Sequence, residues 1–332
     1  DFYADRMRLM RLDRDSGAST PLLEDWDRSP AGWSFGTDKA LWFHAEDDGA
    51  QKIFRLDLAP TREAPAKEAR GTPQPLVHAG TNAGPKQAPD GHIYFTGHTA
   101  ACPTEVWRVS PEGGAPTRVT WFSEEALQDV ALGEVRDYRI EGSEGAQVQV
   151  VVVLPPDHQP GAPAPLLHSI HGGPHGLFGD LWHYRWNTQL FAEPGYVVAC
   201  VNFQGSTSWG NDFAQRIQGA WGERPYGDVM RATDHLISAG LVDESRMAIS
   251  GGSYGGYLTS WIATQTDRFQ CAINHAGVFD LALQYASDVT WGRPKNMGAQ
   301  IWDDPAQVDK WNPARHTASL NTPMLVIHGE KD

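Results

Sequence analysis

The chain has 332 residues, 40% hydrophobic and 20% charged, which is enough apolar material for the cores of about two globular domains. Its 27 basic and 41 acidic residues give 27 − 41 = −14, which argues against nucleic acid or anionic lipid as a partner, because both need a basic surface. No run reaches the ~18 apolar residues of a membrane-spanning helix. Cys102, Cys200 and Cys271 form neither a zinc motif nor a disulfide pattern. We predict no metal and no cofactor, and leave the compartment open between cytoplasm and periplasm.

A repeated pattern of short strands occupies the first third of the chain. Three pairs of segments match at offsets of 52, 53 and 44 residues, namely 38–43 with 90–95, 53–56 with 106–109 and 10–13 with 54–57. Such a period is typical of β-propeller blades, so residues 1–130 are predicted to form two to three blades. A β-sandwich with accidental similarity is the alternative. Because propellers carry four to eight blades, we expect the amino-terminal blades to be absent from this chain.

The pattern changes after residue 130. A hairpin is predicted at 135–140 and 147–154, and a proline-rich loop follows. Strands are then predicted at 166–170, 196–201, 246–250, 269–273 and 323–328, with helices at 228–239 and 254–266. Continuous apolar strands separated by helices indicate a mostly parallel, doubly wound sheet that is covered on both faces.

A G-x-S-x-G motif is centred on Ser253, in the segment Gly251-Gly252-Ser253-Tyr254-Gly255-Gly256. A predicted strand precedes it and a predicted helix follows, which is the setting of a nucleophile elbow. Only glycine at 251 and 255 leaves room for strand and helix to approach, while the tight turn exposes the serine hydroxyl. The alternative, a plain glycine-rich phosphate loop, lacks the lysine and the spacing of a P-loop. The motif therefore predicts an α/β-hydrolase domain over residues 131–332 with Ser253 as nucleophile.

A serine nucleophile needs an oxyanion hole, a base and an acid that orients the base. His171-Gly172-Gly173 follows a predicted strand at the place where α/β-hydrolases supply a backbone donor. The N–H groups of Gly173 and Tyr254 are therefore the predicted oxyanion donors. The histidines of this loop, His171 and His175, are expected to shape it rather than to act as the base.

Asp332 is the predicted catalytic acid, because it follows the apolar strand 323–328 and would emerge at the same sheet edge as Ser253. In the order Ser, Asp, His the base must follow Asp332, and none of the 13 histidines does so. We therefore expect the domain to be truncated before its catalytic histidine.

These segments together resemble the prolyl oligopeptidase family of serine peptidases, in its acylaminoacyl-peptidase and dipeptidyl-peptidase V branch. The matching motifs are 171–175, the segment Asn202-Phe203-Gln204-Gly205-Ser206-Thr207-Ser208-Trp209-Gly210, residues 251–257 and residues 323–332. The resemblance implies a β-propeller joined to an α/β-hydrolase, with Ser253 as nucleophile, Asp332 as acid, and Tyr254 and Gly173 as oxyanion donors. It also implies a histidine about thirty residues beyond Asp332. His171 stands where prolyl oligopeptidases proper carry a tyrosine.

The resemblance further implies hydrolysis of short peptides near their amino end through an acyl-enzyme. An apolar pocket for the substrate side chain is expected at Val278, Leu281 and Tyr285, with ordinary core packing as the alternative. Two other functions stay open, a carboxylesterase with the same elbow and a non-catalytic propeller module. Unpaired blade edges would let a second copy of the chain pair with the first, so a homo-oligomer is a further expectation.

Overall fold

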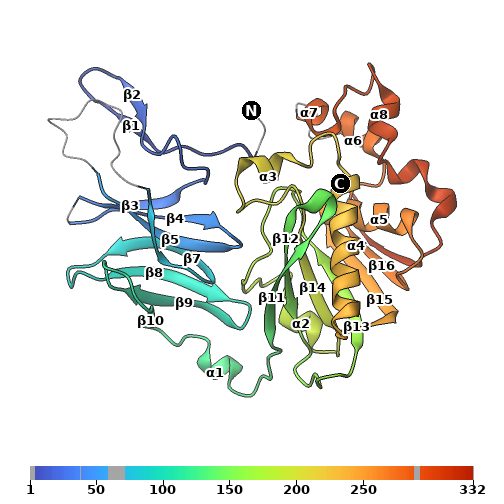
Figure 1. Ribbon diagram of the computed structural model, residues 1–332, viewed down its shortest axis with the longest axis horizontal. Helices are drawn as coiled ribbons and strands as arrows, with labels where there is room; N and C mark the ends of the chain where they lie inside the picture. The colour runs from blue at the N-terminus through green and yellow to red at the C-terminus, as the bar shows by residue number, and fades with distance from the viewer. Residues whose placement is uncertain (1–3, 38, 59–71, 288–291, 332) are drawn as a thin grey trace.

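The computed structural model describes residues 4–37, 39–58, 72–287 and 292–331 (Figure 1). Two bodies of β-structure lie side by side, the amino-terminal sheet in blue to cyan and the seven-stranded sheet with its helices in green to red. The short helix α1 (Glu124–Leu127) lies on the connection between them (Figure 1). The predicted division after residue 130 falls in the segment between α1 and the first strand of the second sheet.

The amino-terminal sheet consists of two four-stranded antiparallel units. The strands of the first unit are β3 (Ala31–Phe35), β4 (Leu41–Asp47), β5 (Ala50–Leu56) and β6 (Gln74–Val77), and those of the second are β7 (Thr81–Gln87), β8 (Ile93–Thr99), β9 (Cys102–Val109) and β10 (Thr117–Arg118). One parallel pair, Gln51 with Thr81, joins the two units. A separate hairpin of β1 (Met10–Leu12) and β2 (Ser19–Pro21) precedes them. Short antiparallel meanders of this kind are the units of a propeller.

Each blade begins with a strand that none of the repeated sequence segments contains. The additional strands are β3 and β7, which begin the two units. β7 lacks an alternating apolar pattern, whereas β3 has one whose Trp33 and Phe35 are exposed instead of buried in the core. Both strands have an irregular register against the next strand. Gly84 and Pro85 interrupt β7, and neither residue is typical of a strand interior.

The strands of the first blade are apolar on both faces, so the blade must be covered twice. Trp42 and Ile53 pack with Ile93 and Phe95 of the second blade. On the opposite face a second apolar cluster is formed by Leu41, Phe43, Phe54 and Leu56, against which Leu9, Leu23 and Trp26 pack. Stacking against a neighbour on each side is what blades of a propeller require.

The second sheet has the order β11-β12-β14-β13-β15-β16-β17. Its strands are β11 (Val135–Glu141), β12 (Gln147–Val153), β13 (Ala164–Ile170), β14 (Val197–Asn202), β15 (Val242–Gly252), β16 (Cys271–His275) and β17 (Met324–Ile327). The first two pairings are antiparallel and all later ones are parallel. The predicted mostly parallel sheet is therefore confirmed.

Helices cover both faces of this sheet because its strands alternate apolar side chains between the faces. On one face, Val150 and Ala199 belong to the large core that includes α4 (Glu223–Ser238) and α5 (Tyr254–Gln265). On the other face, Val153 and Val198 pack with Phe191 and Ala192 of α2 (Thr188–Ala192). The remaining helical segments are α3 (Asn211–Gln215), α6 (Leu281–Ser287), α7 (Arg293–Met297) and α8 (Pro305–Asp309), with short turns at Ser143–Gly145, Pro313–Arg315 and Thr317–Ser319.

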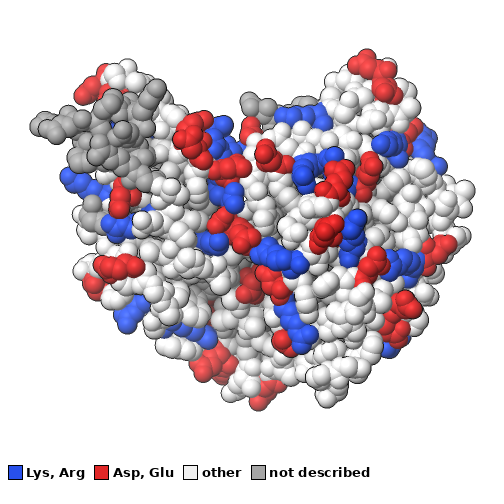
Figure 2. Space-filling model, viewed as in Figure 1, with Lys and Arg blue, Asp and Glu red and all other residues white. Residues whose placement is uncertain are grey.

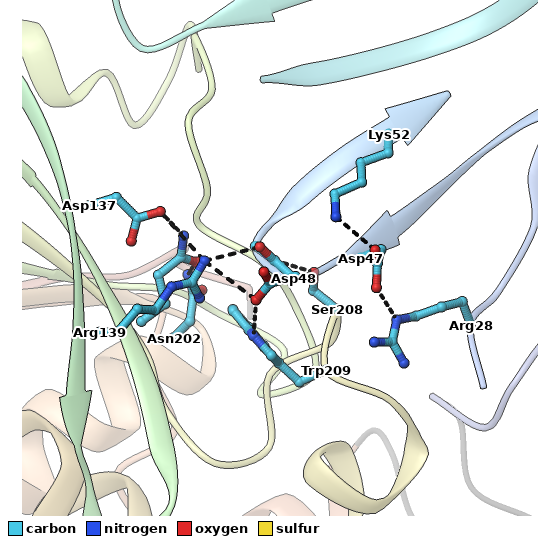
Figure 3. A network of polar contacts seen from close by, with 11 residues as sticks. Arg28, Asp47, Asp48, Lys52, Asp137, Arg139, Asn202, Ser208 and Trp209 are labelled. Atoms are coloured by element: carbon cyan, nitrogen blue, oxygen red, sulfur yellow. Dashed lines mark hydrogen bonds and ion pairs between the residues drawn. The ribbon is translucent and has the colours of Figure 1, made fainter. Parts of the chain in front are cut away.

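The turn between β4 and β5 ties the first blade to the second sheet (Figure 3). The N–H groups of Asp48 and Gly49 donate to the carbonyl and hydroxyl oxygens of Ser208, at 3.0 and 2.7 Å. The Asp48 carboxylate accepts from the Trp209 indole at 3.2 Å and lies 3.5 Å from the Arg139 guanidinium. This turn is held to the neighbouring body by backbone and side-chain contacts together.

Charge is mixed over the face of the molecule that Figure 2 shows. Acidic and basic side chains alternate over the face in Figure 2 and form no single-sign field. Within the described residues, no helix has the length and apolar character that spanning a bilayer demands.

Candidate active site

Ser253 stands at the turn between β15 and α5 in a backbone conformation that non-glycine residues rarely adopt. Its φ is 56° and its ψ −121°, a strained position of the kind that concentrates at functional sites. The residue is exposed, and its side chain makes no capping hydrogen bond to α5. Its N–H donates to the carbonyl of His275 at 2.9 Å. The strand β16 therefore holds the turn while the hydroxyl faces outward.

The glycines around Ser253 are places where backbone touches backbone. A Cβ on Gly251 would overlap the peptide of Gly255, and a Cβ on Gly255 would overlap the carbonyl of Ile170. The helix therefore begins directly against the ends of β15 and β13. This is the steric role that the sequence motif indicated.

The loop after β13 lies against the elbow. A Cβ added to Gly172 would lie 3.3 Å from the Cβ of Ser253. Gly173 is exposed, with a φ of 120°, and among the described residues its N–H has no hydrogen-bond acceptor. Gly173 thus lies at the elbow with a peptide N–H that is available to donate a hydrogen bond to an oxyanion.

His171 is buried and organises this loop. Its ring stacks on Phe203 with centroids 4.3 Å apart, Nδ1 donates to the Gly172 carbonyl at 2.8 Å, and Nε2 lies 2.9 Å from the Ser206 hydroxyl. Because a carbonyl can only accept, the proton of the neutral ring is on Nδ1. Burial lowers the pKa of His171 to about 4. His171 therefore stays neutral and acts as a loop anchor.

Tyr254 is the first residue of α5 and lies next to Ser253. Its side chain is buried, and its hydroxyl donates to the Trp221 carbonyl at 2.6 Å. Its N–H lies in the first turn, where the peptide hydrogens of a helix point out of the amino end. The partial positive charge of that end favours a developing anion.

Asp332 lies outside the described residues, so its place relative to Ser253 stays a prediction. The strand that leads to it, β17, pairs in parallel with β16, and Ala276 N–H donates to the Ile327 carbonyl at 2.7 Å. The carboxyl end of β17 therefore lies at the same sheet edge as the elbow. Within the described part of the chain, no histidine ring is hydrogen-bonded to the Ser253 hydroxyl.

The predicted pocket residues lie beyond β16, at the start of α6. Leu281 is 1% exposed and Tyr285 8%, and the Tyr285 hydroxyl donates to the Ala299 carbonyl at 2.8 Å. Val278 is half-buried and packs against the same core. Their role in binding substrate stays a prediction, and Leu281 has little surface to offer.

Trp186 is a neighbour of the elbow that the sequence did not single out. A Cβ on Gly252 would lie 2.7 Å from the indole Cζ2, and the indole meets the His275 ring edge-on at 5.3 Å. With 13 tryptophans in the chain, no local signal marks this one. Only the fold brings it against the residue that precedes Ser253.

Two other groups of residues lie away from Ser253. Glu124 and Glu125 are exposed on α1. A pocket of about 230 Å³ opens between the first blade and the loop after β14, where Arg28 and Glu46 face Asn211, and burial raises the pKa of Glu46. Ser253 does not line it. In the described ranges, no three histidine, cysteine or acidic side chains are grouped so as to hold a metal ion.

Comparison with known proteins finds similarity to a family of peptidases. Residues 182–332 match the model of the prolyl oligopeptidase family. The dipeptidyl-peptidase 5 of Aspergillus fumigatus is 28% identical over 93% of the chain and 43% of its own length. The dipeptidyl-peptidase 5 of Porphyromonas gingivalis is 31% identical over 71% of the chain and 35% of its own length. The chain thus spans less than half the length of these curated relatives.

Solved structures support the same fold. The acylaminoacyl peptidase of Pyrococcus horikoshii superposes with a TM-score of 0.83 at 22% identity, covering 99% of this chain and 50% of that one. A puromycin-hydrolyzing peptidase of Mycobacterium tuberculosis gives a TM-score of 0.74 at 22% identity, covering 98% and 50%. The predicted fold, an α/β-hydrolase domain preceded by part of a β-propeller, is confirmed. Residues 182–332, which make up most of the hydrolase domain, are similar to the prolyl oligopeptidase family.

Proposed function

We propose that the protein is a serine peptidase that hydrolyses short peptides near their amino end, with Ser253 as the nucleophile. The observation that carries the proposal is an exposed serine at φ 56°, packed by glycines against a loop whose Gly173 N–H has no acceptor among the described residues. The relatives named dipeptidyl-peptidase 5 support the substrate class.

The chemistry follows from the placement of these groups. Ser253 Oγ bonds to the substrate carbonyl carbon, its proton passes to the base, and the carbonyl oxygen becomes an oxyanion beside Gly173 and Tyr254. One such donor is typically worth about 3–4 kcal/mol of barrier. The C–N bond then breaks, the leaving amine takes the proton, and water hydrolyses the acyl-enzyme. In the proposal Asp332 orients a histidine that follows it in sequence.

A fluorophosphonate probe tests the nucleophile in the intact protein. Wild type is expected to be labelled at Ser253, and Ser253→Ala to lose both labelling and peptidase activity by at least about 1,000-fold. Ser260→Ala, on the same helix but buried, is the matched control and should still be labelled. An unlabelled wild-type protein would overturn the proposal.

The choice of substrate separates the alternatives. Dipeptidyl anilides, N-acyl-amino-acid anilides and simple esters are compared with the same preparation. Cleavage of either anilide class supports the proposal and says which amino end is accepted. Cleavage of esters alone would show a carboxylesterase instead.

A further inference from the structure

We propose that Trp186 is a specificity-determining residue that contacts the leaving-group side of a bound peptide, and that the second blade positions it. The inference rests on the proposed function of Ser253. It adds a substrate contact from the α2 face of the sheet, whereas the predicted pocket residues lie on the α5 face.

Trp186 touches the two residues that fix the elbow. Its six-membered ring lies against Gly252, which precedes Ser253, and its edge-on contact is with His275, whose carbonyl accepts the Ser253 N–H. The residue is half-buried, so part of its side chain is accessible next to the residue that precedes Ser253, with the Arg185 guanidinium 5.8 Å from the ring centroid. A large, rigid apolar surface in this place offers a contact to a substrate side chain.

The backbone around Trp186 is held on both sides. The N–H groups of Arg185 and Trp186 both donate to Nδ1 of His183, at 3.0 and 2.9 Å. After it, the Asn187 side chain caps α2 by accepting from Gln189 and Leu190. These bonds fix the indole in front of Gly252, and fixed side chains discriminate better than mobile ones.

The second blade holds the preceding part of the loop. Ala100 N–H donates to the Asp180 carboxylate at 2.6 Å, and the Thr81 hydroxyl donates to the Asp180 carbonyl at 3.0 Å. Trp182 N–H donates to Nδ1 of His98 at 2.9 Å. Three contacts from two blade segments therefore set the loop that leads to Trp186.

Trp186 and the predicted pocket for the acyl residue lie on opposite faces of the second sheet, so we assign the Trp186 contact to the leaving group. Tyr254 and Val278 pack in the core on the α5 face, so a side chain of the acyl residue is expected on that face. Trp186 comes just before α2, on the opposite face. A peptide whose carbonyl lies at Ser253 would then extend its leaving residue toward the indole.

The experiment varies the leaving residue in the intact protein. A peptide series has one fixed acyl part and Gly, Ala, Leu or Phe after the scissile bond, and an ester with the same acyl part and a methanol leaving group is the reference. For Trp186→Ala, kcat/KM is expected to fall about 10-fold or more with Leu and Phe but less than about 3-fold with Gly and with the ester. Trp186→Phe should keep most of the preference, and Trp302→Ala, 72% exposed, should behave as wild type.

Two outcomes would overturn the proposal. One is an equal loss for every leaving residue, and the other is a loss that follows the acyl residue instead. A fluorophosphonate labelling rate within about 3-fold of wild type shows that Ser253 is intact in the variant, so failure of this proposal is distinguishable from failure of the proposed function.

The positioning by the blade is tested with His98. His98→Ala removes the acceptor of Trp182 N–H, whereas His98→Asn keeps an acceptor near the Nδ1 position. His98→Ala is expected to lose about 3-fold or more of the Leu and Phe preference, with recovery in His98→Asn. Preferences unchanged in His98→Ala would overturn the role of the blade.

Discussion

The elbow and the contacts around the blades both hold separate segments of the chain against one another, but they do so with different groups. At the elbow, Gly251 and Gly255 remove side chains so that peptide groups meet directly. In and around the blades, acidic side chains accept hydrogen bonds from backbone N–H groups of segments elsewhere in the chain. Asp180 accepts from Ala100, and Glu105 from Phe122 and Ser123.

The difference teaches where the sequence carries information. Close backbone packing needs glycine at neighbouring positions, so it leaves a local motif. A carboxylate that accepts a distant N–H leaves no spacing to recognise in the sequence. Asp180 and its partner Ala100, for example, are 80 residues apart. Part of the acidic excess of the chain is thus internal structure rather than a binding surface.

The largest effect is expected from a side chain added to the elbow. In Gly255→Ala the new Cβ would overlap the Ile170 carbonyl, and neither backbone can retreat without opening the sheet. We expect a loss of at least about 3 kcal/mol in the free energy of unfolding, or failure to fold. Urea unfolding followed by tryptophan fluorescence measures it.

Gln265→Ala, at the exposed carboxyl end of the same helix, is the control for this change. It should stay within about 0.5 kcal/mol of wild type. A Gly255→Ala protein as stable as this control would show that the elbow is not closely packed.

The acid contacts are tested next at Glu105, on β9. Its side chain is 0% exposed and receives the Arg118 guanidinium, the Thr120 hydroxyl and two backbone N–H groups. Burial works against ionisation, but the hydrogen bonds from Thr120 and Ser123 prevail and lower its pKa from 4.5 to about 2. In Glu105→Gln the amide NH₂ group, which is itself a donor, would face the hydrogen-bond donors that the carboxylate accepts from. We expect the free energy of unfolding to fall by about 2–4 kcal/mol at pH 7.

The sign of the pH dependence follows from that lowered pKa. The stabilisation by Glu105 is fully present above pH 4.5 and is lost as the pH falls toward about 2, because the unfolded chain takes up the proton first. The difference in the free energy of unfolding between wild type and Glu105→Gln, measured with urea, should therefore shrink as the pH falls from 4.5 toward about 2. Glu125→Gln, on the exposed face of α1, should show no difference at any pH.

The smallest effect is expected at Arg139. Its contact with Asp48 spans the two bodies at 3.5 Å, but the side chain is 38% exposed and screened by water. Arg139→Ala should lower the free energy of unfolding by less than about 1 kcal/mol, and by less still in high salt. Arg246→Ala, which breaks the local pair with Asp243, is the matched control. A loss above about 2 kcal/mol would mean that this pair matters more than its exposure indicates.

Much of the architecture was predictable because it depends on patterns of residues that are close together in the sequence. Strands of the second sheet such as β14 and β17 consist largely of apolar residues. Gly251, Ser253 and Gly255 mark the elbow by their spacing between a predicted strand and a predicted helix. The blade repeat revealed strands such as β4 and β8, whose apolar residues fill the core. It did not reveal β3, whose apolar side chains Trp33 and Phe35 lie on the surface, or β7, which glycine and proline interrupt.

The candidate site was predictable to the same extent. Backbone groups at Gly173 and Tyr254 follow from the motif, and the structure places both beside the elbow, although their catalytic role stays a prediction. Trp186 could not be predicted, because its place depends on a loop that is tied to His98 and Ala100, more than 80 residues earlier. Tertiary contacts of that range have no local signature.

The contact between Gly49 and the second sheet has a consequence for protein engineering. Gly49 lies against Gln149, which receives the Asn202 amide, and Asn202 in turn binds both backbone groups of Phe178. A chimera whose blades come from another protein therefore needs a turn between β4 and β5 that fits against Gln149. A graft joined only at the covalent linker would carry a mismatch to Phe178, whose ring packs against His171 in the loop next to Ser253.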